Sequence, residues 1–351
     1  MFNPKYKITN EIVSQLTEIA EIKALVAKST LLPEREIFLR RAAVVKMAHS
    51  STSIEGNTLK EHQVAQVAEG KEVTAEKKQI LEVRNYLAAL WDVDLLAGRV
   101  EVITPETILR LHKVVIDGLV DKEKAGVFRF GQVYVVNVLP NKEEEIAYTP
   151  PKSAEVPERV AELAEWLKGH GEIHPILRAG LFHYQFETIH PFTDGNGRTG
   201  RLLTLLQLYL SGWDFKKILV LEDYYNRNRK AYYEALLTGV TYKARQDADL
   251  TAWLEYFVAG FLDEAQRVKD QVLNLAVVGD IRSERNVLDK DEIQIVDFVI
   301  TMGQITSEDV VGILGVPKRT AQDKLKRLED AKILKKKGSG PNTVYVVKKY
   351  L

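Results

Sequence analysis

The spacing of apolar residues along the chain predicts a mainly α-helical protein. Long runs place apolar side chains every three or four residues, which is the spacing of one helix face. These runs cover residues 33–55, 104–119, 155–168, 175–189, 198–211 and 250–282. Strand-like sequence is confined to residues 133–136 and 146–148, which predict a short β-hairpin. We therefore expect an N-terminal helical region over residues 1–95 and a helical core over residues 96–245 that carries the hairpin.

The C-terminal part of the chain has a different pattern. After a helical connector over residues 246–283 and a polar linker over 283–289, three short helices and two strands are expected. The helices are placed at residues 289–301, 306–314 and 317–331, and the strands within 333–347. This order is typical of a winged helix-turn-helix domain, which we place at residues 284–351.

Charge supports a nucleic-acid partner for this C-terminal domain only. The chain as a whole has 49 Lys plus Arg and 49 Asp plus Glu, so no global field favours nucleic acid or a membrane. Residues 315–351 carry 11 Lys and Arg against 3 Asp and Glu, a net charge of +8. Duplex DNA is therefore a candidate partner of residues 284–351, although winged helices also bind proteins. The expected DNA-facing residues are Lys318, Arg319, Thr320, Gln322 and Lys324 on the third helix, and Lys335, Lys336 and Lys337 on the wing.

The amino-acid composition excludes several classes of protein and of site. The chain has no cysteine, which excludes disulfides and thiolate metal sites. Its first residues lack the apolar core of a signal peptide, and the strongly apolar stretch at 202–210 is too short to span a bilayer. We expect a soluble, cytoplasmic protein without a membrane partner.

The candidate chemistry is concentrated in residues 190–201, which read His-Pro-Phe-Thr-Asp-Gly-Asn-Gly-Arg-Thr-Gly-Arg. Pro191 disfavours α conformation at His190, so the helix over 175–189 should end there and present the imidazole. The Asp-Gly-Asn-Gly run predicts a tight loop, and a helical pattern resumes at Arg198. A glycine-rich loop that leads into a helix is an anion site, because free backbone N–H groups point at the ligand. Arg198 and Arg201 share a helix face and can reach the same polyphosphate.

These residue types indicate transfer of a phosphorus-containing group to a hydroxyl. His190 can remove a proton near neutrality, since an unperturbed imidazole has a pKa of about 6.5. Asp194 offers a hard oxygen ligand beside phosphates, which suits Mg²⁺. Two alternatives stay open: a hydrolase in which His190 and Asp194 bind a metal, and a glycine-rich helix entry with incidental charges. A P-loop is excluded because the Gly-Lys-Ser/Thr ending is missing.

A second candidate residue, Glu55, lies at the predicted end of the helix over 33–55. Gly56-Asn57 stops that helix, and Thr58 to Glu61 has the form of a capping box that opens the next one. An acid at a helix C-terminus is disfavoured by the dipole. A cationic partner would explain Glu55, and a solvated surface glutamate is the alternative.

The twelve-residue segment matches the signature His-x-Phe-x-Asp/Glu-Gly-Asn-Gly-Arg-x-x-Arg, so the chain resembles the Fic family. The resemblance implies a mainly α Fic fold and protein AMPylation, the transfer of AMP from Mg·ATP to a Ser, Thr or Tyr hydroxyl of a target protein. It implies that His190 is the general base and that Asp194 binds Mg²⁺, for which Mn²⁺ could substitute. It also implies that Arg201 holds the γ-phosphate. The implied nucleotide site comprises Gly195, Asn196, Gly197, Arg198, Thr199, Gly200 and Arg201.

Residues 51–56 match the inhibitory motif Ser/Thr-x-x-x-Glu-Gly/Asn of Fic proteins. By this resemblance Ser51, Glu55 and Gly56 form an N-terminal inhibitory element. Glu55 would pair with Arg201 and so withdraw that arginine from the γ-phosphate.

The resemblance extends to the hairpin and to a tyrosine pair. The strand containing Ile146, Ala147, Tyr148 and Thr149 resembles the Fic flap, which pairs with the target segment through main-chain hydrogen bonds; an ordinary hairpin is the alternative. Tyr232 follows Asn-Arg-x-x and would line the adenine site, unless it is a core tyrosine.

Three further residues have less specific interpretations. His112 is interpreted as a packing or hydrogen-bonding residue. His183 and Glu187 could orient His190, or they could pack near the site.

Other functions remain compatible with the sequence. The chain could be a nucleotide-sensing, DNA-binding transcription regulator whose core binds ATP. It could also be a Fic enzyme that removes AMP or uses another nucleotide donor. Self-association is common in the family, so a homodimer is a further candidate partner.

Overall fold

The computed structural model describes residues 2–138, 144–275, 288–339 and 343–348, and these are mainly helical, as predicted. The N-terminal region contains α1 (Asn10–Lys28), α2 (Pro33–Ile54), α3 (Glu61–Ala68) and α4 (Lys77–Ala97). The core contains α5 (Pro105–Ile116), α6 (Val156–Gly169), α7 (Pro175–Ile189), α8 (Asn196–Leu210), α9 (Leu221–Arg227), α10 (Arg229–Leu236), α11 (Tyr242–Gln246) and α12 (Thr251–Leu275). Short 3₁₀ turns lie at η1 (Lys122–Lys124), η2 (Ser153–Glu155) and η3 (Phe215–Lys217).

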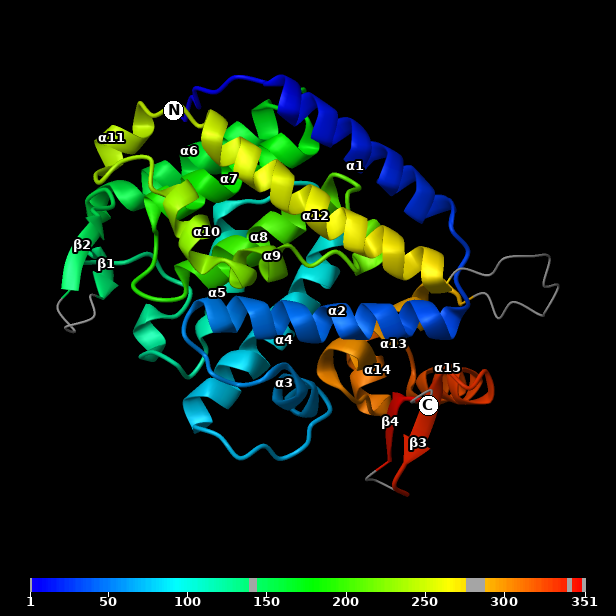
Figure 1. The fold of residues 1–351 in the computed structure, drawn as a ribbon. Coiled ribbons are helices and arrows are strands. Elements are labelled where there is room, and N and C mark those ends of the chain that lie inside the picture. Colours follow the sequence, from blue (N-terminus) through cyan, green and yellow to red (C-terminus); the bar gives the residue numbers. More distant parts are fainter. Residues whose placement is uncertain (1, 139–143, 276–287, 340–342, 349–351) are drawn as a thin grey trace.

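Helices α7 and α8 form the centre of the fold, and other helices surround them. Nearly every side chain of α7 is buried, from Ile176 to Ile189, although its sequence has only a weak apolar face. Helices α4 and α5 pack on α8, α12 packs on α7, and α1 runs along α12 on the outside (Figure 1). Since the 190–201 segment connects α7 to α8, the surrounding helices hold both of its ends in place.

The capping residues in the sequence predicted the start of α5 correctly but not the start of α3. Thr104 accepts a hydrogen bond from the backbone N–H of Thr107 and Pro105 is the first residue of α5, as expected. The capping box predicted at Thr58 is wrong, because α3 begins later. There the backbone N–H of Lys60 donates to Gln63 Oε1 (2.9 Å), whereas the hydroxyl of Thr58 donates to Gln79 Oε1 of α4 (3.0 Å). A tertiary partner therefore replaces the local cap.

The predicted hairpin is present as an antiparallel pair, β1 (Val135–Val138) and β2 (Glu144–Tyr148). Val136 lies opposite Ile146, and the register shifts between Val135 and Val136. The turn that joins the strands, at residues 139–143, lies outside the described residues.

The C-terminal part contains the predicted three helices and two strands. They are α13 (Lys290–Met302), α14 (Ser307–Leu314), α15 (Lys318–Asp330), β3 (Leu334–Lys337) and β4 (Val344–Val347). Asp289 and Thr306 cap α13 and α14. Ile37 of α2 packs into the apolar core of this part, so it is joined to the N-terminal region rather than separate from it. The last residues of the predicted connector and most of the predicted linker, residues 276–287, lie outside the described residues. The centre of the wing loop, residues 340–342, also lies outside them.

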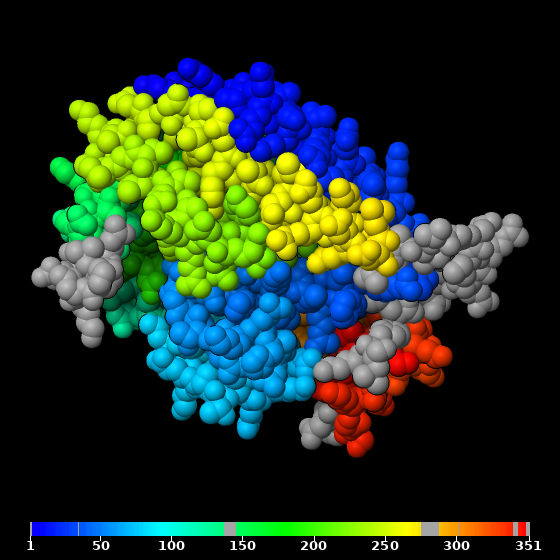
Figure 2. Space-filling model, viewed as in Figure 1, coloured from blue at the N-terminus to red at the C-terminus, as the bar shows by residue number. Residues whose placement is uncertain are grey.

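The N-terminal region and the C-terminal part lie against each other along α2. In the space-filling view the mid-blue and cyan surface of the N-terminal region lies below the green and yellow core helices, and the C-terminal part, in red, lies beside it at the lower right (Figure 2). None of the helices within the described residues combines the length and the apolar character needed to cross a membrane.

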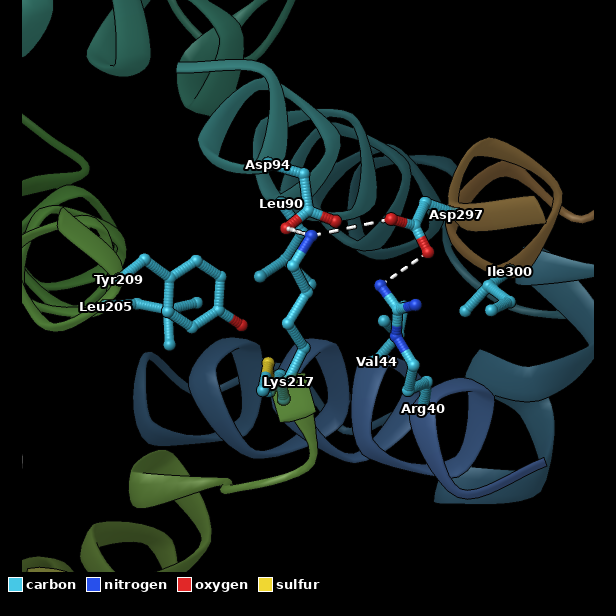
Figure 3. A pocket seen from close by; sticks show the side chains of 10 residues that line it. Arg40, Val44, Leu90, Asp94, Leu205, Tyr209, Lys217, Asp297 and Ile300 are labelled. Carbon is cyan, nitrogen blue, oxygen red and sulfur yellow. Dashed lines mark hydrogen bonds and ion pairs between the residues drawn. The ribbon is translucent and has the colours of Figure 1, made fainter. Parts of the chain in front are cut away.

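A buried charge network joins α2, α4, η3 and α13 around a small cavity (Figure 3). Lys217 Nζ lies 2.9 Å from Asp94 Oδ1 and 3.4 Å from Asp297 Oδ2, and Arg40 pairs with the other oxygen of Asp297. Two cations and two carboxylates therefore balance each other. Burial raises the pKa of Asp94, while Lys217 acts in the opposite direction.

We expect Asp297→Ala to destabilise the fold strongly. The substitution would leave Arg40 and Lys217 with one carboxylate in a buried site, and breaking a buried ion pair costs about 3–5 kcal/mol in free energy of unfolding. Urea denaturation of the full chain measures this loss. Asp247→Ala is the matched control, because Asp247 pairs with Lys5 in an exposed position (side chains 72% and 60% exposed). Equal losses in the two variants would contradict the buried network's contribution.

Candidate active site

The loop between α7 and α8 places His190 in a strained conformation. Helix α7 ends at Ile189, and His190 has φ 50° and ψ 62°, in the left-handed region that non-glycine residues rarely adopt. Its backbone N–H still donates to Phe186 O (3.0 Å). Gly195, with φ 80°, precedes α8, which begins at Asn196. The predicted helix end at His190 and the loop are confirmed, but the helix resumes at Asn196 rather than at Arg198.

Asn196 closes the loop with its side chain. Phe192 N donates to Asn196 Oδ1 and Asn196 Nδ2 donates to Phe192 O, both at 2.8 Å. Both the oxygen and the nitrogen of the amide are therefore bonded within the loop. Asn196 therefore gives the loop a defined shape, independently of any bound phosphate.

His112 of α5 supports the same loop from outside. Its ring stacks on Phe192 at 3.6 Å, and Gly126 N donates to Nδ1 (3.1 Å). Nδ1 is therefore an acceptor, so Nε2–H donates to Asp194 O (3.0 Å). Burial lowers the pKa of His112 to about 4, which keeps this neutral tautomer. The interpretation of His112 as a packing and hydrogen-bonding residue is confirmed.

The first turn of α8 carries hydrogen-bond donors that could bind an anion. The first N–H groups of a helix have no intrahelical partner. The side chain of Arg198 is almost fully buried, and its Nη2 donates to Asp194 Oδ1 (3.1 Å). Nε and Nη1 have no hydrogen-bond partner among the residues that the structure describes, although the carboxylate of Glu82 lies 4.0 Å from Nη1. Buried unpaired donors are costly, so an anion here would satisfy them. Thr199 and Gly200, which follow Arg198 in the first turns of α8, are buried as well.

Asp194 is accessible enough to bind a cation that arrives with a ligand. Its side chain is 48% exposed, and Oδ1 already accepts from Gly195 N (2.5 Å). Within the described ranges no group of three or more His, Asp or Glu could hold a metal by itself. A single carboxylate nevertheless fits Mg²⁺, which commonly takes its other ligands from phosphates and water.

Burial is the main reason that His190 favours its neutral form. Burial lowers its pKa to about 4, Arg129 and Arg245 act in the same direction, and Glu55 and the backbone of Glu187 act against them. The imidazole is therefore uncharged at neutral pH and can accept a proton. Of the two residues considered as orienting His190, Glu187 lies beside Gly200 and Arg201, where burial raises its pKa to about 7.

His183 does not contact His190. Its Nδ1 and Nε2 share hydrogen bonds with Thr204 Oγ1 and the hydroxyl of Tyr232, both at 2.8 Å. Tyr232 is thus buried, with its ring stacked on Tyr225 at 4.4 Å. The adjacent Tyr233 is the exposed member of the pair, and its hydroxyl lies 3.5 Å from Ile54 O. The surroundings of Tyr232 are those of a core tyrosine.

Glu55 reaches the site from the end of α2. Arg201 Nη2 donates to Glu55 Oε1 (2.8 Å) and to Ser51 O (2.9 Å), and Arg201 Nε donates to Ser51 Oγ (2.8 Å). Burial lowers the pKa of Arg201, but Glu55, Tyr232 and Tyr86 together outweigh burial, and the net shift is upward. Gly197 makes room, because a Cβ there would collide with the Glu55 carboxylate, and Gly56 turns the chain away with φ 96°. The ion pair predicted between Glu55 and Arg201 is present.

The predicted flap residues differ in accessibility. Ile146 is 54% exposed on β2, and Ala147 is partly buried. Tyr148 is buried, and its hydroxyl donates to Thr188 O (2.6 Å). Thr149 N donates to Val240 O (2.9 Å), so this backbone group is already paired within the chain. Only the part of β2 before Tyr148 is therefore open to another strand.

The residues predicted to face DNA differ in their exposure and in their ion pairs. Lys318 pairs with Glu308 (2.5 Å), and Lys324 pairs with Asp289 and Asp291 (3.1 Å each), so α13 already neutralises Lys324. The exposed members of the set are Lys318, Arg319, Thr320 and Gln322 on α15 and Lys335, Lys336 and Lys337 on β3.

Sequence reasoning missed Arg129. Its buried guanidinium donates to the backbone carbonyls of His190, of Gly131 before β1 and of Pro151 after β2. The available signal was an arginine between Phe128 and Phe130, in a run that otherwise leads into a strand.

Comparison with known proteins identifies relatives of this region. Residues 102–208 match the Fic/DOC family. The chain is 35% identical over 171 residues to protein adenylyltransferase fic-1 of Caenorhabditis elegans, covering 47% of this chain and 32% of that protein. It is 33% identical over 216 residues to protein adenylyltransferase Fic of Drosophila willistoni, covering 58% of this chain and 41% of that protein. It thus spans less than half of either relative.

A solved structure resembles the whole chain. The crystal structure of a Fic family protein from Desulfovibrio desulfuricans G20 superimposes with a TM-score of 0.65 at 27% identity, covering 99% of this chain and 98% of that one. The likeness therefore includes the N-terminal and C-terminal helices as well as the core. The 190–201 loop, with His190, Asp194, Arg198 and Arg201, lies within the segment of this chain that matches the Fic/DOC family.

Proposed function

We propose that this protein is an adenylyltransferase that transfers AMP from Mg·ATP to a Ser, Thr or Tyr hydroxyl of a target protein. The observation that carries the proposal is His190, whose pKa burial lowers to about 4, in the loop that leads into α8, where the buried Nε and Nη1 of Arg198 have no hydrogen-bond partner among the described residues. A base and a polyphosphate site so close together suit attack of a hydroxyl on phosphorus. The adenylyltransferase names of the relatives support the same reaction.

In the proposed reaction His190 accepts the proton of the target hydroxyl. The oxygen attacks the α-phosphorus, the bond to the β-phosphate oxygen breaks, and pyrophosphate leaves. The backbone N–H groups of Gly195, Asn196 and Gly197 and the donors of Arg198 would stabilise charge on the phosphates. Asp194 would hold Mg²⁺, or Mn²⁺ in its place, which supplies further neutralisation of phosphate charge when bound.

Most of the remaining predicted residues have roles in this proposal. Arg201 would bind the γ-phosphate once Glu55 is displaced, so the N-terminal element of Ser51, Glu55 and Gly56 would be autoinhibitory. Ile146 and Ala147 on β2 would pair with the target segment. The predicted role of Tyr232 in lining the adenine site is not part of this proposal, because its ring is buried in the core.

Intact-mass spectrometry of purified Glu55→Gly protein incubated with Mg·ATP tests the reaction. We expect a mass increase that matches covalent AMP, on the protein itself or on a target added from lysate. Glu55→Gly/His190→Ala, treated in parallel, should show none. An adduct in the His190→Ala protein would contradict the base assignment. No adduct on any protein would favour the nucleotide-sensing regulator, and loss of AMP from a modified protein would favour AMP removal.

A second proposal concerns duplex DNA as a partner of residues 284–351. It is favoured by the exposed row Lys335, Lys336 and Lys337 on β3. The test uses the full chain, because Ile37 of α2 completes the core of this part. We expect a mobility shift of duplex DNA at low salt that weakens as salt rises and is lost when the three lysines are replaced by glutamate. No shift at low salt would contradict DNA binding.

A further inference from the structure

Arg129 is a buried cation without an acidic partner among the described residues. It lies in the segment between η1 and β1 and is 3% exposed. Burial lowers the pKa of its guanidinium, and Tyr148 is the one group that acts against this. Its charge is instead compensated by backbone carbonyls, which is costly unless each bond has a defined geometry.

The carbonyls that it binds belong to three different segments. Nε donates to His190 O (2.9 Å), Nη1 to Gly131 O (3.0 Å) and Nη2 to Pro151 O (2.5 Å). Gly131 precedes β1 and Pro151 follows β2, so these two bonds clamp the base of the hairpin. The third bond reaches the residue that carries the catalytic imidazole.

The backbone of Arg129 adds a second connection. Arg129 N donates to Pro191 O (3.0 Å), so two consecutive carbonyls after α7 are held by one residue. Tyr148 of β2 holds Thr188 O in the same helix turn. The carbonyls at the end of a helix lack intrahelical partners, and here the hairpin region provides them.

We infer that Arg129 is a positioning residue that fixes the backbone of His190, and through it the imidazole, to the base of the β1–β2 hairpin. The left-handed conformation of His190 is unfavourable for a side chain with a Cβ, so it persists only where surrounding bonds hold it. Without Arg129 the carbonyl of His190 is free to rotate, and the ring moves with it. The catalytic part of this inference rests on the proposed transfer reaction; the backbone connection does not.

Arg129 also influences the protonation of His190. The charged groups that act on the imidazole are Arg129, Arg245 of α11 and Glu55 at the end of α2, and the backbone of Glu187 in α7 also interacts with the ring. Arg129 favours the neutral ring, so its removal raises the pKa of His190. The acid limb of a pH–rate profile that reports His190 then moves to higher pH.

The experiment compares Arg129→Gln and Arg129→Lys in the Glu55→Gly background of the full chain. We expect kcat for AMP transfer to fall by about 100-fold in Arg129→Gln, since misplacing a catalytic group by about 1 Å costs that much. The dissociation constant for ATP should change by less than about two-fold, because the α8 donors are untouched. Arg129→Lys keeps the charge and one donor, so its acid limb should stay near that of the parent.

Arg178→Gln is the matched control. Arg178 is a partly buried arginine at the opposite end of α7 that donates to His170 O (3.4 Å) and Ser211 Oγ (3.0 Å). It should lower thermal stability and leave kcat and the pH limb unchanged. Equal falls of kcat in the Arg178 and Arg129 variants, or an unmoved limb in Arg129→Gln, would overturn the positioning role.

A separate readout distinguishes this inference from the proposed function. If the Glu55→Gly parent transfers no AMP, NMR titration of the His190 ring in the full chain still tests the connection. A higher pKa and a broadened or shifted His190 resonance in Arg129→Gln, but not in Arg178→Gln, would support it. An unchanged His190 signal would refute it irrespective of the reaction.

Discussion

Release of Glu55 is expected to raise AMP transfer by about 10- to 100-fold, the range that corresponds to a charge-assisted hydrogen bond of about 1.5–3 kcal/mol. In the present structure Arg201 donates to Glu55 and to Ser51, so its Nη2 and Nε groups are already engaged and not free for a γ-phosphate. Glu55→Gly removes the carboxylate and vacates the space above Gly197. Initial rates of transfer, from radiolabelled ATP or intact mass, measure the gain.

The controls separate release from a general change in the fold. Glu55→Gln keeps the size of the side chain and weakens the pairing, so it should give a smaller gain. Arg201→Ala should remove transfer both alone and combined with Glu55→Gly, because in the proposed mechanism this arginine binds the γ-phosphate in either background. Equal activity of Glu55→Gly and the parent, at equal folded concentration, would contradict the inhibitory role.

Replacement of His190 by alanine is expected to lower transfer by at least about 10²- to 10⁴-fold, the usual contribution of a general base. The ring is neutral because burial lowers its pKa to about 4, so the base form is already present at neutral pH. Nucleotide binding should be nearly unaffected, since the proposed phosphate donors lie on the first turn of α8 and on Arg198. Comparing kcat with the dissociation constant for ATP, in the Glu55→Gly background, measures both effects.

A second substitution at His190 provides a further control. His190→Gln keeps a polar side chain but cannot accept a proton at neutral pH, so it should be as inactive as His190→Ala. The backbone conformation imposed by Arg129 and Pro191 should persist in both variants, and their unfolding midpoints should match. A His190→Ala enzyme with near-parental kcat would remove His190 from the reaction.

The sequence by itself determined the features that depend on neighbours along the chain. Pro191 predicted the end of α7, Thr104 and Pro105 predicted the start of α5, and Asp289 marked the start of α13. The twelve-residue segment predicted a loop with a base, a carboxylate and anion-binding donors. These signals work because helix ends and tight turns are governed by bonds that span only a few residues.

The start of α3 shows where local reasoning stopped. Thr58 has the side chain of a cap, but its hydroxyl is taken by Gln79 of α4, and α3 begins at Glu61 instead. Tyr232 is a similar case, because its segment suggested a ligand role whereas His183 and Tyr225 enclose its ring. In both cases a partner from another helix decided which of two compatible arrangements formed.

Only the tertiary structure decided which distant residues meet at the site. Arg201 and Glu55 are 146 positions apart, Arg129 and His190 are 61 apart, and His112 and Asp194 are 82 apart. The family motif suggested the first pair, but nothing in the chain's local pattern indicated the other two. A buried polar group must find a partner somewhere, and the packing of α2, α5 and the hairpin around α7 and α8 determines which carbonyl or carboxylate is within reach.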